Sequence, residues 1–147
     1  MTILAIVLGL IPLVLGGILN WIALNTSWWY FGFVFMSILM LAVWIMLAYY
    51  MRPRLKDTFN TVILLNLFAV IFLVLFTVQR MSSNEFIPGT IGRWPQLFFL
   101  PLTFFGGILT GSSGDSLFAC NAVGFLIMLL LSYFGCILSE KNSNSFS

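Results

Sequence analysis

Long apolar runs separated by short polar breaks make up most of this chain. Four of the runs are long, and they cover residues 3–24, 28–51, 59–79 and 117–138. A helix needs about 20 apolar residues to cross a hydrocarbon core of about 30 Å. The pattern therefore predicts four transmembrane helices.

A fifth apolar segment, residues 97–110, is too short for the same assignment. It has 14 residues, with Pro101 near its start and Gly106 and Gly107 near its middle. Apolar segments of about 10–14 residues are more often re-entrant or interfacial than spanning. We predict an all-α integral membrane protein, a bundle of four transmembrane helices plus one short re-entrant or interfacial helix. Five transmembrane helices are the alternative, with residues 94–96 lengthening the segment.

The same pattern places a single membrane-embedded helical domain over residues 1–138. Residues 139–147 are polar apart from Phe146, and we predict a disordered tail there. Residues 80–96 form the longest polar segment between the apolar runs, and we predict a loop there.

Prolines and capping residues predict where individual helices bend, end and begin. Pro12 lies inside the first apolar run and should bend it. Pro53 follows the second run and should stop its helix. Asp57 or Thr58 can then cap the next helix, because short oxygen-bearing side chains accept bonds from the first free backbone N–H groups.

Small residues mark places where two helices can come close together. They occur at four-residue spacing as Ala5 with Gly9 and as Gly107 with Gly111, and residues 16–17 add an adjacent glycine pair. Helices in lipid associate through close backbone approach at such positions. Gly107 and Gly111 are therefore candidate helix-contact residues.

Composition indicates that lipid covers much of the surface. Hydrophobic residues make up 61% of the chain and charged residues 7%, against roughly 25% charged in soluble domains. Six basic and four acidic side chains cannot supply a charged surface. The net charge is only +2 without a long basic run, so we expect no nucleic-acid partner.

The residue types present argue against an enzyme. The chain has no histidine, which is the commonest general base and metal ligand. We therefore predict no catalytic, cofactor-binding or metal-binding residues and no cofactor. A lipid-directed enzyme is the remaining hypothesis of this class, and it would depend on Glu85, Asp115 or Lys56.

The two cysteines, Cys120 and Cys136, lie in one apolar run. On a helix they would be separated by about 24 Å, so they cannot form a disulfide within it. We predict two buried free thiols.

Basic residues predict the orientation, because lysine and arginine in short loops tend to stay in the cytoplasm. The cluster Arg52, Arg54 and Lys56 is the strongest such signal. It places residues 52–58 and the N-terminus in the cytoplasm. With four crossings Lys141 joins them, which favours four crossings over five.

Three asparagines within the apolar runs are candidate helix-contact or polar-cleft residues, namely Asn20, Asn66 and Asn121. An amide in hydrocarbon seeks a partner across a helix interface, which contributes about 0.6 kcal/mol on average. Asn66 lies two turns into its run, whereas Asn20 and Asn121 lie closer to the run ends.

These observations favour a non-catalytic multi-pass protein of the cell membrane. We expect an accessory, regulatory or immunity-type partner that acts through helix–helix contacts. The alternative is a small transporter or channel that works as an oligomer. The expected partners are the lipid bilayer and either another membrane protein or a second copy of the chain.

Overall fold

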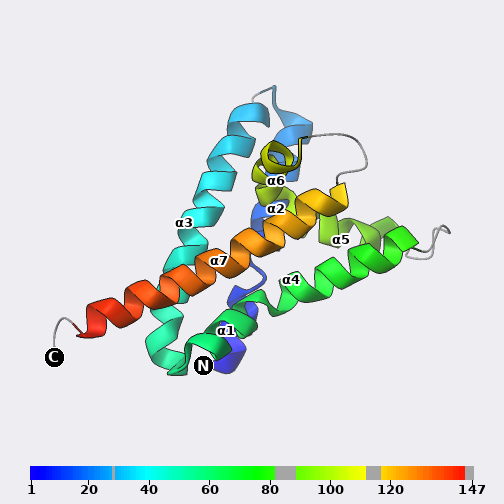
Figure 1. Cartoon of the computed structure of the whole chain (residues 1–147). Coiled ribbons are helices and arrows are strands. Elements are labelled where there is room, and N and C mark those ends of the chain that lie inside the picture. Colours follow the sequence, from blue (N-terminus) through cyan, green and yellow to red (C-terminus); the bar gives the residue numbers. More distant parts are fainter. Residues whose placement is uncertain (28, 82–88, 112–116, 145–147) are drawn as a thin grey trace.

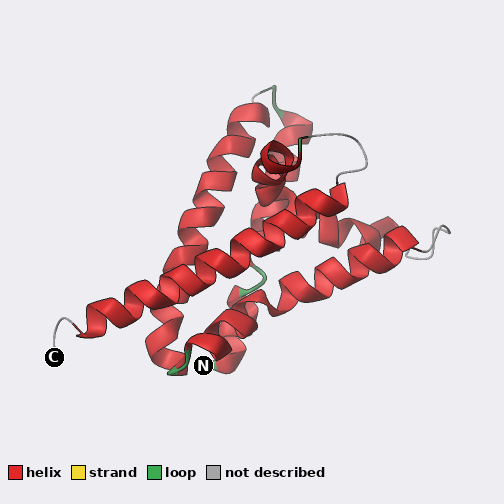
Figure 2. Cartoon of the chain, viewed as in Figure 1, coloured by secondary structure: helices red, strands yellow, loops and turns green. Residues whose placement is uncertain are grey.

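The computed structural model describes residues 1–27, 29–81, 89–111 and 117–144, and the described part is almost wholly helical (Figures 1 and 2). The elements in chain order are α1 (Thr2–Leu8), α2 (Ile11–Asn25), α3 (Trp29–Leu55), α4 (Thr58–Met81), α5 (Gly89–Phe99), the 3-10 turn η1 (Leu100–Leu102), α6 (Thr103–Thr110) and α7 (Leu117–Asn144).

Four helical segments in the described part of the chain are long and apolar enough to cross a membrane. They are Thr2–Asn25, Tyr30–Leu55, Thr58–Val78 and Phe118–Asn142. The shorter helices α5 and α6 complete the bundle. The prediction of an all-α bundle of four spans plus a short additional helical segment is confirmed.

The first span consists of two helices, α1 and α2, with a break at Gly9 and Leu10 (Figure 1). Pro12 lies in the first turn of α2. A proline ring clashes with the carbonyl four residues earlier, which here belongs to Leu8, the last residue of α1. The bend predicted at Pro12 is therefore confirmed. The helix is broken at Gly9 and Leu10, directly after the residue with whose carbonyl the ring would clash.

The turn between α3 and α4 differs from its prediction at one residue. Pro53 lies inside α3 and does not stop it. The helix continues to Leu55 because proline removes only one backbone donor near its end. It stops where Lys56 adopts a left-handed φ of 59°, and Lys56 N–H donates to the Arg52 carbonyl over 3.0 Å.

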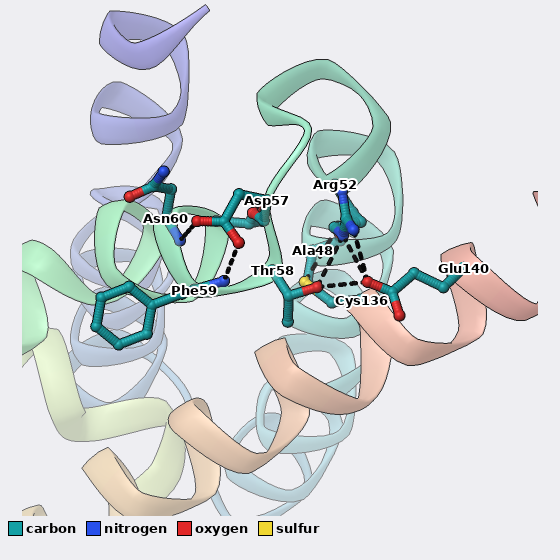
Figure 3. A network of polar contacts seen from close by, with 9 residues as sticks. Ala48, Arg52, Asp57, Thr58, Phe59, Asn60, Cys136 and Glu140 are labelled. Carbon is teal, nitrogen blue, oxygen red and sulfur yellow. Dashed lines mark hydrogen bonds and ion pairs between the residues drawn. The ribbon is translucent and has the colours of Figure 1, made fainter.

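The start of α4 follows the prediction. The two carboxylate oxygens of Asp57 accept hydrogen bonds from the N–H groups of Phe59 and Asn60, each over 3.2 Å (Figure 3). Asp57 thus caps the helix and leaves Thr58 as its first residue.

The segment α5–η1–α6 enters and leaves the bundle at the same end. It follows the end of α4 by seven residues and precedes the start of α7 by six residues. At its turning point, Pro101 and Leu102 are buried. Leu102 and Phe99 lie against Gly124, about 10 Å along α7 from its start. The segment is therefore a re-entrant helical hairpin rather than a fifth crossing.

The hairpin is sheltered by the long helices. Phe98 packs on Phe72 of α4 with ring centroids 4.8 Å apart, and on Phe99 at 5.1 Å. Both hairpin phenylalanines are fully buried. Backbone groups of a re-entrant segment are costly in contact with lipid, and this burial removes that cost. Residues 89–96 also belong to α5, so the predicted loop over residues 80–96 is wrong there.

The C-terminal residues 139–144 continue α7, so the predicted disordered tail is wrong for them. The reason is tertiary contact. Glu140 bonds to Arg52 of α3, and Asn142 Nδ2 donates to the Tyr49 hydroxyl over 2.8 Å. Residues 145–147 lie outside the described part.

The two ends of the bundle differ in charge. The end formed by the turn at residues 52–58 also receives the end of α7, so it gathers Arg52, Arg54, Lys56 and Lys141. The N-terminus lies there too (Figure 1). We refer to it as the basic end, and to the end with residues 25–27 as the far end.

Candidate functional site

A polar junction joins three helices at the basic end (Figure 3). Arg52 of α3 donates from Nη2 to Glu140 Oε1 over 2.6 Å and from Nε over 2.9 Å. Its Nε also lies 2.8 Å from Thr58 Oγ1 of α4. The Thr58 hydroxyl donates to the same Glu140 oxygen over 2.6 Å. One carboxylate on α7 therefore binds the ends of α3 and α4 together.

Local sequence features bring these three side chains together. The left-handed turn at Lys56 and the cap at Asp57 bring the Thr58 hydroxyl to within 2.8 Å of Arg52 Nε. On α7, Gly135 allows a close approach to α3, because a Cβ there would lie 2.5 Å from the Ile45 carbonyl oxygen. Cys136 Sγ lies 4.0 Å from the Ala48 carbonyl oxygen, one turn inward (Figure 3).

The junction is partly exposed. The side chain of Arg52 is 20% exposed and that of Glu140 is 45% exposed. Half-exposed ion pairs contribute modestly to stability, but this arrangement also fixes geometry through a shared acceptor. The junction can therefore hold three helix ends in register. Its polar groups form hydrogen bonds with one another.

The sequence pattern predicts an orientation role for Arg52, Arg54 and Lys56 and a polar tail that includes Glu140. The structure gives Arg52 a second role that the prediction missed. A signal was present, since Glu140 is an acidic residue directly after an apolar run whose predicted end lies on the same side as the basic turn.

The charge-reversed variant Glu140→Lys is expected to weaken the contact between α3 and α7, because it places two cations side by side. The double variant Arg52→Glu with Glu140→Lys should recover part of the loss. The loss of stability should be smaller than that caused by an added Cβ at Gly135, since the ion pair is partly exposed. Denaturation followed by circular dichroism in detergent micelles measures it. A double variant no better than the sum of the single variants would contradict the pairing.

Asn66 lies deeper in the bundle and bonds across a helix interface. Its Nδ2 donates to Ser132 Oγ of α7 and to the Val62 carbonyl, each over 2.8 Å. The Ser132 hydroxyl in turn donates to the Met128 carbonyl over 2.8 Å. Asn66 is buried. Its Oδ1 has no hydrogen-bond partner among the described residues.

The other two asparagines lie apart from the junction. Asn121 is buried in α7, and its Oδ1 has no hydrogen-bond partner in the described part of the chain. Asn20 lines an open groove between α2 and α5 together with Arg93 and Gln96. The structure therefore does not gather Asn20, Asn66 and Asn121 into one site.

The glycines separate into contact positions and open positions. A Cβ on Gly107 or Gly111 would meet nothing described within 4 Å, whereas one on Gly106 would lie 2.7 Å from the Cys120 carbonyl oxygen. Within the described chain, Gly106 thus makes the close helix approach for which we considered Gly107. Helix contact through Gly107 and Gly111 stays a prediction.

Near the N-terminus, Gly9 makes the contact expected of the Ala5 and Gly9 pair. A Cβ on Gly9 would lie 2.9 Å from the Leu65 carbonyl oxygen of α4, and Ala5 is buried.

Groups considered for catalysis do not converge in the described residues. Glu85 and Asp115 lie outside the described part, and Lys56 is exposed in the turn. Cys120 and Cys136 are buried and not joined in a disulfide, as predicted. Among the described residues, no three or more His, Cys, Asp or Glu side chains gather where they could hold a metal ion.

The fold and composition define a multi-pass helical membrane protein. No family model, curated protein or solved structure matches the chain.

Proposed function

We propose that this chain is a non-catalytic partner of another membrane protein, an accessory, regulatory or immunity-type subunit that acts through helix–helix contacts. The observation that carries the proposal is the filled interior. Trp44, Phe98 and Phe99 are fully buried and belong to one apolar cluster that packs α3, α4, α7 and the hairpin together. A solute passing through one such chain would have to displace these side chains.

The outer face of α6 offers a surface for the partner. Among the described residues, nothing lies within 4 Å of a Cβ built on Gly107 or Gly111. Ile108 and Leu109 beside them are largely exposed. In lipid, apolar surface gives little drive for association, and close packing at small residues supplies it instead. This face of α6 is therefore where we expect a partner helix to bind.

Site-specific photo-crosslinking in native membranes tests this proposal. A crosslinking residue at position 108 should link to a larger membrane protein, and Gly107→Leu should abolish the product. Val14 is a matched control, because its side chain is 61% exposed against 64% for Ile108. Equal products from both positions, or none from position 108, would contradict the proposal.

A small transporter or channel that works as an oligomer is the second candidate, and one observation favours it. Trp44 Nε1, Asn66 Oδ1 and Asn121 Oδ1 are buried without a hydrogen-bond partner among the described residues. Unpaired polar groups in an apolar medium are costly, and water in an open path would satisfy them. This candidate requires crosslinks between copies of the chain, and flux in reconstituted vesicles that Asn66→Leu removes.

For the orientation, we propose that the basic end faces the cytoplasm of a cell membrane, with the N-terminus and the turn at residues 52–58 inside. Four of the six basic residues lie at that end, as the distribution of lysine and arginine predicts. In a chain with both native cysteines replaced by alanine, Thr26→Cys should react with an impermeant thiol reagent in intact cells. Lys141→Cys should react only after the cells are opened. The reverse pattern would refute this orientation.

A further inference from the structure

A groove of about 420 Å³ lies between α2 and α5, near the far end of the bundle. Its lining combines two amides and a guanidinium with three leucines, namely Asn20, Gln96, Arg93, Leu24, Leu97 and Leu100. The volume falls within the range of about 300–1,000 Å³ that is usual for small-molecule sites. The lining is therefore suited to an amphiphilic ligand.

Contacts on both walls place the groove relative to a bilayer. A Cβ on Gly16 would lie 1.7 Å from the Leu97 carbonyl oxygen, so α5 lies directly against the first span. Each wall also carries an exposed tryptophan next to a polar lining residue. Trp21 follows Asn20 and is 62% exposed, and Trp94 follows Arg93 and is 48% exposed. Exposed tryptophans favour the headgroup level of a membrane.

The apolar part of the groove leads away from that level. From Arg93, the α5 wall continues through Leu97 and Leu100 to the buried turn at Pro101 and Leu102. On the α5 wall the lining therefore passes from charged to apolar as the chain enters the bundle, in the same order as a phospholipid passes from headgroup to acyl chain, whereas on the α2 wall Leu24 lies nearer the far end than Asn20.

Arg93 forms no ion pair with an acidic side chain in the described part of the chain. The ion pair observed there joins Arg52 to Glu140. A cation held beside a membrane span is costly unless it is paired or reaches the interface. A guanidinium fits phosphate oxygens with two parallel hydrogen bonds, and this geometry favours phosphate as its partner.

We propose that this groove binds an anionic phospholipid. The Arg93 guanidinium donates to the lipid phosphate, Asn20 and Gln96 donate their amide hydrogens to phosphate or glycerol oxygens, and an acyl chain lies along Leu97 and Leu100. This site is independent of the partner proposed for α6, and either can fail while the other stands.

Lipid titration of the full chain in detergent micelles tests the site, with binding followed by native mass spectrometry. Phosphatidylglycerol should bind, and Arg93→Gln should weaken the apparent Kd about tenfold or more, as expected for the loss of a charge-assisted bond. Arg93→Lys should retain part of the affinity. Arg93 is exposed, so these variants should keep the fold, and circular dichroism checks this directly.

Three comparisons decide whether the effect belongs to this groove. Arg54→Gln removes an exposed arginine at the basic end and should leave the Kd unchanged. An equal loss in Arg54→Gln would mean unspecific charge attraction and overturn the proposal. Glu85→Gln removes the charge of the acidic residue nearest to Arg93 in sequence. Tighter lipid binding in that variant would show that Arg93 pairs with Glu85 and not with lipid, and would overturn the proposal. Displacement of the lipid by millimolar inorganic phosphate would show a small-anion site and also overturn it.

Discussion

The variant Gly16→Ala is expected to lose about 3 kcal/mol of unfolding free energy, the upper end of the usual cost of overpacking. The added Cβ would lie 1.7 Å from the carbonyl oxygen of Leu97 and 2.7 Å from its carbonyl carbon. Both atoms belong to backbone, so no side chain can rotate to make room. The re-entrant hairpin would have to move away from the first span, and Phe98 and Phe99 would then become less buried.

The neighbouring glycine provides a matched control. A Cβ on Gly17 would meet no described atom within 4 Å, and alanine is a better helix former than glycine by about 1 kcal/mol. Gly17→Ala should therefore be neutral or slightly stabilising. Denaturation of both variants in mixed micelles, followed by circular dichroism, measures the difference. Equal stabilities for the two variants would refute the close packing of α2 against α5.

Substitution of Gly135 by alanine should cause the second large loss, about 1–3 kcal/mol. A Cβ there would lie 2.5 Å from the Ile45 carbonyl oxygen, 2.8 Å from Ala48 Cβ and 3.2 Å from the Tyr49 backbone nitrogen. Two of these three atoms are backbone of α3. Helix α7 would have to shift away from α3, which would also separate Arg52 from Glu140.

Gly124 on the same helix is the control for that prediction. Its nearest neighbour would be Leu102 Cβ at 3.3 Å, against 2.5 Å for the Ile45 carbonyl oxygen beside Gly135, so a shift of a few tenths of an ångström makes room for it. Gly124→Ala should therefore cost clearly less than Gly135→Ala in the same unfolding assay. A larger loss for Gly124→Ala would show that α3 and α7 are not as closely packed as the structure has them.

The two predictions also bear on the function. Gly16 and Gly135 act at different interfaces, since one joins the hairpin to the first span and the other joins α3 to α7. If the chain recognises a partner through the outer face of α6, Gly16→Ala should weaken that interaction by displacing the hairpin. Gly135→Ala should first weaken the contact between Arg52 and Glu140 at the basic end. Comparison of crosslinking at position 108 in the two variants separates a general loss of stability from a local change in the partner surface.

The sequence by itself determined the features that depend on one segment and its surroundings. The length of each apolar run determined the four spans, and the short run at residues 97–110 predicted the re-entrant segment. Pro12 predicted the break in the first span, because the clash of its ring lies within a single helix. Asp57 predicted the start of α4 for the same local reason.

Only the tertiary structure decided which side of each helix faces another helix. The spans are apolar on all sides, so periodicity does not show whether Gly16 or Gly17, or Gly106 or Gly107, lies at a contact. Helix rotation follows from packing with distant segments. The same reason explains why the sequence did not predict the hydrogen bonds that Arg52 donates to Glu140, or the helical end of α7. Arg52 and Glu140 are 88 residues apart in the sequence, and only the packing of α3 against α7 brings them within bonding distance.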